Sequence, residues 1–88
     1  MKLDITEFVM LAGTELAIQM IRNRIAIAPD IIDTVSEFAE EMCTGLYHIR
    51  LDPNSYSYIY FENPVDRDNI LALCHKIDSA DPSDSKYH

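Results

Sequence analysis

The amino-acid sequence predicts a small α+β domain in which three helices pack on a two-stranded antiparallel β-hairpin, in the order α-α-β-β-α. Three observations predict this fold class. Apolar residues recur at helical spacing over 4–25 and again over 29–43. Apolar and aromatic residues alternate on both sides of a turn over 46–62, which is typical of a hairpin. A further helix start follows at Asn63-Pro64.

The first helix is expected to span 4–25. Asp4 can cap its first turn, and Glu7 completes a capping box three residues later. Two apolar stripes run along this helix. The stripe expected to face the core consists of Ile5, Phe8, Val9, Ala12, Leu16 and Met20. The second stripe consists of Met10, Ala17, Ile21 and Ile25.

The second stripe of the first helix has two interpretations. The hairpin or the last helix of the same chain could cover it, or it could form the interface of a homo-oligomer. A chain of 88 residues buries only somewhat more than about 60% of its unfolded surface, so apolar faces are left for a second subunit. The hairpin also has an open edge. We therefore expect self-association, most simply as a dimer.

The second helix is predicted over 29–43, with Pro29 in its first turn and Gly45 just past its end. Its apolar arc consists of Ile31, Ile32, Val35, Phe38, Ala39 and Met42. The opposite side, here called the acidic face, consists of Asp30, Asp33, Glu37, Glu40 and Glu41. No lysine or arginine occurs between Arg24 and Arg50. The acidic face is either a solvated surface or a docking site for a basic partner.

Residues 46–62 are predicted to form the hairpin, with a loop at 53–55 and Asp52 opposite Tyr56. In this register one side carries Tyr47, Ile49, Leu51, Ile59 and Phe61. The other side, here called the tyrosine face, carries His48, Arg50, Tyr56, Tyr58 and Tyr60. A slip of one residue in the strand pairing would instead place the tyrosines of the second strand beside Tyr47, Ile49 and Leu51. The tyrosines and Arg50 are candidate partner-binding residues, because both types are common at binding hot spots; the alternative is aromatic packing between strands.

The third helix is predicted from Pro64 to about Ser79. Asn63 can cap it, and Asp66 and Asp68 lie favourably near the positive end of the helix dipole. Its predicted buried residues are Ile70, Leu73, Cys74 and Ile77. One domain over 1–79 would contain all of these elements, followed by a flexible polar tail at 80–88.

The sequence contains no recognisable catalytic or metal-binding pattern. Its only glycines are Gly13 and Gly45, so there is no glycine-rich phosphate loop, and the G-x-S-x-G and H-E-x-x-H motifs are missing. A zinc site would have to draw on Cys43, His48, Cys74 and His75, which lack paired Cys-x-x-Cys spacing. We therefore expect no metal, no cofactor and no enzymatic activity.

Net charge and hydropathy restrict the class of partner. The formal net charge is −8 and the pI is near 4.5, which argues against contact with nucleic-acid phosphates or anionic membranes. No apolar run is long enough to cross a bilayer, and the first residues do not resemble a signal peptide. A cytoplasmic protein with a neutral or basic partner is expected.

The preferred function is a non-enzymatic, acidic protein-interaction module, a small inhibitor or regulator of a basic nucleic-acid-handling protein. Phage anti-defence proteins, nuclease immunity proteins and antitoxins share this size and charge, which is an analogy of composition. The alternative is a homo-oligomeric structural or assembly protein whose acidic face serves solubility. A third hypothesis is a small-ligand binder whose pocket, at a subunit boundary, is lined by Arg50, Tyr56 and Tyr58.

Overall fold

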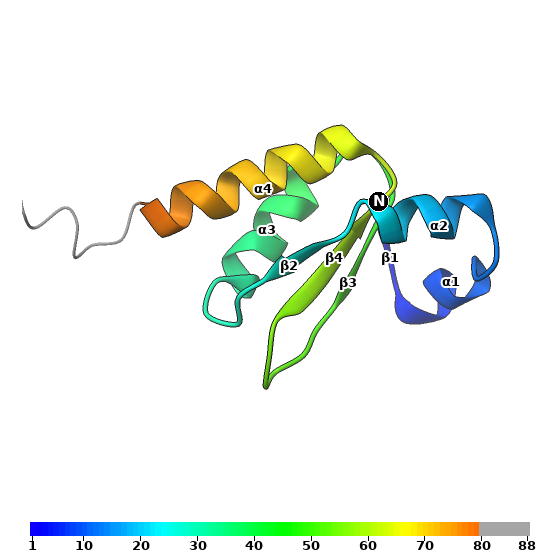
Figure 1. The fold of residues 1–88 in the computed structure, drawn as a ribbon, viewed down its shortest axis with the longest axis horizontal. Coiled ribbons are helices and arrows are strands. Elements are labelled where there is room, and N and C mark those ends of the chain that lie inside the picture. Colours follow the sequence, from blue (N-terminus) through cyan, green and yellow to red (C-terminus); the bar gives the residue numbers. More distant parts are fainter. Residues whose placement is uncertain (80–88) are drawn as a thin grey trace, which may run out of the picture.

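A computed structural model of the protein describes residues 1–79, and the predicted tail at 80–88 lies outside the described residues. Within the described part, four strands form one mixed sheet in the order β1-β3-β4-β2, and helices lie on both of its faces (Figure 1). In chain order the elements are β1 (Lys2–Leu3), α1 (Ile5–Met10), α2 (Glu15–Arg22), β2 (Ile25–Ile27), α3 (Ile32–Met42), β3 (Tyr47–Arg50), β4 (Ser57–Phe61) and α4 (Pro64–Ser79).

The prediction of three helices on a two-stranded hairpin is wrong. The hairpin of β3 and β4 exists in the predicted register, with Tyr47 opposite Phe61 and Arg50 opposite Tyr58. However, it forms only the centre of the sheet, because β1 pairs in parallel with β3 and β2 pairs antiparallel with β4. In β2, Ile25 and Ile27 are buried and Ala26 is exposed, so the helices cover this edge of the sheet on one face only.

The prediction of one continuous helix over 4–25 is also wrong, because this segment forms two helices, α1 and α2. The capping box at its start is present as expected, with the Glu7 backbone N–H donating to Asp4 Oδ1 at 2.7 Å. The break follows at Gly13, which has a φ of 84°, a conformation that favours glycine. Thr14 then caps α2, since its Oγ1 accepts a hydrogen bond from the Ala17 N–H.

Dividing the helix changes which of its apolar residues are buried. Ile5 and Val9, predicted to face the core, are each 59% exposed, and Ala12 is exposed as well. Met20 is fully buried, whereas Phe8 and Leu16 are partly buried. The predicted core stripe is therefore only partly present, because the two helices leave Phe8, Leu16 and Met20 packed in one apolar cluster. Ile5, Val9 and Ala12 are exposed instead.

Two apolar clusters lie on opposite faces of the sheet. The larger cluster joins the sheet to α3 and α4 and contains Ile25, Ile27, Ile32, Val35, Ala39, Tyr47, Ile59, Phe61, Ile70 and Cys74. The smaller cluster joins the other face to α1 and α2 and contains Leu3, Met20 and Tyr60, with Phe8, Leu11, Leu16 and Leu46 packed against them. The two layers of helices are separate in Figure 1, with α3 and α4 together on one side and α1 and α2 on the other.

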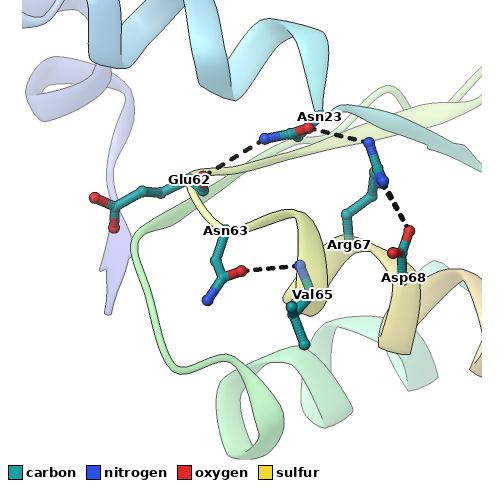
Figure 2. Close-up of polar contacts among 6 residues, drawn as sticks. All are labelled: Asn23, Glu62, Asn63, Val65, Arg67 and Asp68. Carbon is teal, nitrogen blue, oxygen red and sulfur yellow. Dashed lines mark hydrogen bonds and ion pairs between the residues drawn. The ribbon is translucent and has the colours of Figure 1, made fainter.

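A group of polar contacts ties the end of α2 to the start of α4 (Figure 2). The Asn23 side chain is central to it, since its Oδ1 accepts from Arg67 Nη1 at 3.0 Å while its amide nitrogen lies 3.5 Å from the Glu62 carbonyl oxygen. Asn63 caps α4 as predicted, accepting from the Val65 N–H at 2.8 Å. Arg67 also forms an ion pair with Asp68.

Asp66 anchors the loop after α3 to the first turn of α4. Its side chain is buried, at 2% exposure. Its carboxylate accepts from the Thr44 N–H at 3.1 Å, from Thr44 Oγ1 at 3.0 Å and from the Gly45 N–H at 2.9 Å. A Cβ on Gly45 would lie 3.0 Å from Glu62 Oε1, so a larger residue at position 45 would require the Glu62 side chain to shift.

Candidate functional site

The acidic face lies on the outer side of α3 and in the turn before it. Its five members, Asp30, Asp33, Glu37, Glu40 and Glu41, are all exposed. Helix α3 itself starts at Ile32, about one turn later than predicted, and buries Ile32, Val35 and Ala39 against the sheet. Within residues 1–79 the only ion pair is Arg67–Asp68, so no basic side chain of this part neutralises the acidic face.

Two large apolar side chains lie beside the acidic face. Phe38 and Met42 belong to the predicted apolar arc of this helix, but their side chains are 40% and 39% exposed. They are one turn apart on α3 and so occupy neighbouring positions on its surface. The outer surface of α3 thus combines unpaired carboxylates with an apolar border, which is a composition suited to contact with a protein.

Helix α1 covers one part of the tyrosine face and leaves the other part exposed. His48 and Tyr60 are buried beneath this helix, where the Phe8 ring stacks on His48 at a centroid distance of 4.6 Å and lies 5.0 Å from Tyr60. Arg50, Tyr56 and Tyr58 remain exposed. Tyr60, predicted to bind a partner, therefore offers little surface to one.

The acidic and tyrosine faces are on opposite sides of the sheet. Helix α3 packs on the side that carries Ile59 and Phe61, whereas Tyr58 and Tyr60 alternate with these residues and point to the other side. The sequence alone could not relate the two faces, because their relation depends on which side of the sheet α3 covers. They are two separate candidate surfaces.

His48 has a structural contact on one ring nitrogen. Its Nδ1 lies 2.8 Å from the Leu3 carbonyl oxygen, which can only accept, so Nδ1 carries the proton in this contact. Its Nε2 is buried without a hydrogen-bond partner. The ring holds β1 against β3 and is closed off from the surface by Phe8.

The predicted oligomer interface is split between the surface and the core. Met10 is 79% exposed at the end of α1, and Ile21 is exposed on α2. Ala17 and Ile25 are buried inside the chain, Ile25 within β2. The four residues do not form one stripe, because the helix that would align them ends at Met10 and a strand begins at Ile25.

Cys43 is held as a neutral thiol at physiological pH. Burial raises its pKa to about 11, and the Asp66 carboxylate adds to the increase. Burial also raises the pKa of Tyr47, with contributions from Cys43 and Glu40. A thiolate nucleophile is therefore disfavoured at this position. No group of three or more His, Cys, Asp or Glu side chains within residues 1–79 is arranged to hold a metal ion.

A cleft that was not predicted from the sequence lies between the start of α3 and the hairpin loop. Its volume is about 330 Å³, and Pro29, Ile32, Leu51 and Pro53 form its apolar lining. Asp33, Asp52 and Ser57 supply its polar atoms. Arg50, Tyr56 and Tyr58, which were predicted to line a ligand pocket, are not among its lining residues. The sequence feature that could have indicated this cleft is Leu51-Asp52-Pro53, because Pro53 ends the strand pattern and leaves Leu51 outside the core.

No helix within residues 1–79 combines the length and apolar character needed to cross a membrane. Comparisons of the chain with protein-family models, with curated proteins and with solved structures gave no match. The function must therefore be inferred from the burial, charge and chemistry of the chain's own side chains.

Proposed function

We propose that the protein is a non-enzymatic, acidic interaction module that inhibits or regulates a basic, nucleic-acid-handling protein by docking the acidic face of α3 on it. The observation that carries this proposal is that the five carboxylates of the acidic face are exposed and lack an ion pair within residues 1–79. The proposal places the protein in the cytoplasm of the cell that makes or hosts it. Phage anti-defence proteins, immunity proteins and antitoxins are the classes it fits best.

The spacing of the charges supports a nucleic-acid-binding surface as the target. Within α3, the four carboxylates from Asp33 to Glu41 extend over about 12 Å at 1.5 Å per residue, or one charge per about 3–4 Å. The phosphates of one DNA strand are spaced by about 3.4 Å along the axis. A groove that binds a phosphate backbone would therefore meet a similar density of negative charge on α3.

The free protein also keeps an unfavourable charge arrangement on this helix. Asp33 with Glu37 and Glu37 with Glu41 are like-charged pairs four residues apart, and each costs a few tenths of a kcal/mol. A basic partner would convert this repulsion into attraction and accelerate encounter. Phe38 and Met42 would add apolar contact at the border of the same surface.

Replacing Asp33, Glu37 and Glu40 by serine is expected to weaken capture of the partner by at least about tenfold, because each position loses a charge that faces the partner. The measurement uses the immobilised protein and the heparin-binding protein fraction of the producing or host cell, with the bound protein quantified at several salt concentrations. Capture by the wild type should fall steeply as salt rises, whereas the triple variant should show weak capture with a flatter salt dependence.

The control for this experiment is the oligomeric state, which the triple variant should leave unchanged in light scattering. Equal capture by the wild type and the triple variant would mean that the acidic face serves solubility alone. Added DNA should displace the captured protein if the acidic face occupies a nucleic-acid-binding surface.

The second candidate function is a homo-oligomeric assembly protein. The observation that favours it is the exposure of large apolar side chains on α1 and α2, namely Ile5, Val9, Met10, Ile18 and Ile21. Exposed apolar residues that lie close together commonly mark contact surfaces. These residues are outside the acidic face, so self-association and binding of a basic partner would use different elements.

Replacing Ile21 by aspartate is expected to yield monomers if α2 joins two subunits, because an unpaired charge would be buried at the interface. Light scattering of the wild type and the variant measures this, with Arg22→Asp as a neighbouring exposed control. A wild type that is already monomeric at micromolar concentration would contradict the assembly function.

A further inference from the structure

The cleft between α3 and the hairpin loop is formed by three segments that are distant in the sequence. Pro29 belongs to the turn before α3, Ile32 and Asp33 to the first turn of α3, and Leu51-Asp52-Pro53 to the end of the hairpin strand and its loop. With about 330 Å³ the cleft lies at the lower end of the range of about 300–1,000 Å³ that is usual for sites of small groups. It can accept one side chain of a partner.

The walls of the cleft are mostly apolar and accessible. Leu51 was predicted to share one side of the hairpin with Tyr47 and Ile49, but it is 66% exposed because β3 ends at Arg50. Its side chain is available as one wall, and Pro29 and Pro53 are also exposed. Walls of this kind bind the aliphatic part of a long side chain by removing apolar surface from water.

Two carboxylates give the same cleft a negative charge. Asp33 comes from α3 and Asp52 from the hairpin loop, and no lysine or arginine is among the lining residues. The Asn54 N–H donates to Asp52 Oδ1 at 3.0 Å, which restrains this carboxylate. Neither Asp33 nor Asp52 forms an ion pair with another residue in 1–79. The cleft therefore lacks a cation of its own.

We infer that this cleft receives the side chain of one arginine of the basic partner, with the aliphatic part against Leu51 and the prolines and the guanidinium between Asp33 and Asp52. This inference rests on the proposed function. It identifies the cleft at the start of α3 as the place where one specific side chain of the partner is recognised. Arginine fits better than lysine, because its planar guanidinium has five donors and can engage two carboxylates from different elements at once.

The test titrates N-acetyl-arginine amide into the full-length protein and follows backbone amide resonances by NMR. Shift changes are expected at Asp33, Leu51, Asp52 and Ser57, with a saturable response. N-acetyl-citrulline amide, which has nearly the same shape without the charge, should bind at least about tenfold more weakly. Equal binding of both compounds, or changes that avoid the cleft, would overturn the inference.

Matched variants separate the cleft from the general charge of α3. The double change Asp33→Asn and Asp52→Asn should raise the Kd of N-acetyl-arginine amide about tenfold. The double change Glu37→Gln and Glu41→Gln removes the same charge from the same region and should alter this Kd less than about twofold. Equal effects of the two pairs would contradict a site in the cleft.

Leu51→Ser tests the apolar wall without changing the charge. It should weaken binding of the arginine compound by about threefold, whereas Val65→Ser, at a similarly exposed position of α4, should have no effect. Both positions are exposed, so both variants should fold. An unchanged Kd for Leu51→Ser would exclude the predicted placement of the aliphatic part.

The two proposals fail in different ways. If the triple-serine variant loses the partner but N-acetyl-arginine amide does not bind in the cleft, the inference about arginine is wrong and the proposed function stands. If the arginine compound binds in the cleft but partner capture survives the triple change, the proposed function is wrong and the arginine site stands.

Discussion

Replacing Asp66 by alanine is expected to lower the free energy of unfolding by about 3–5 kcal/mol, because several partly buried donors lose a charged, buried acceptor. The donors are the Thr44 N–H and Oγ1 and the Gly45 N–H, all within 3.1 Å of the carboxylate. Urea denaturation measures the effect. Asp68→Ala in the same helical turn removes an exposed carboxylate and should cost less than about 1 kcal/mol.

Asp66→Asn adds a readout that does not depend on global stability. The Asp66 charge helps to raise the pKa of Cys43, so its removal should shift the pH midpoint of Cys43 alkylation to lower values. Burial is the larger cause and remains, so the midpoint should stay above that of an exposed cysteine. An unchanged midpoint in Asp66→Asn would contradict the proximity of Asp66 and Cys43.

Replacing Phe61 by alanine is expected to cost about 3–5 kcal/mol, because the largest fully buried side chain would leave a cavity in the main cluster. Val9→Ala should change the free energy of unfolding by no more than about 0.5 kcal/mol in either direction, because Val9 is exposed on α1. Urea denaturation of both variants measures the difference.

The comparison of Phe61 with Val9 tests the break in the first helix. On a single helix over 4–25, Val9 would lie in the core stripe and its truncation would cost as much as other buried valines. A cost of Val9→Ala above about 1.5 kcal/mol would therefore contradict the division at Gly13. The same result would also weaken the assembly hypothesis, which depends on the exposure of α1.

Several features of this protein were determined by residues that are close in the sequence. The capping box of Asp4 with Glu7 and the start of α4 at Asn63-Pro64 are present as predicted, since a helix start depends on about four consecutive residues. The register of β3 with β4 is also as predicted, because the short loop and the two-residue alternation leave few other pairings. The exposure of the acidic charges follows from the same kind of local periodicity.

Other features were decided only by the tertiary structure. Strands β1 and β2 are too short to show a periodic pattern, and each is a strand only because a partner distant in the sequence supplies its hydrogen bonds. One glycine inside a helical pattern costs only about 1 kcal/mol. Gly13 was therefore not enough to predict that the first helix is divided into α1 and α2.

The burial of Asp66 and the cleft beside Asp33 have the same origin. In sequence, Asp66 is an ordinary acidic residue in the first turn of a helix, and its role comes from a loop 22 residues earlier in the chain. The cleft likewise requires α3 and the hairpin loop to meet. Local patterns determine caps, periodicity and charge, whereas pairing of distant segments determines which of those residues are covered, and hence which surfaces remain for a partner.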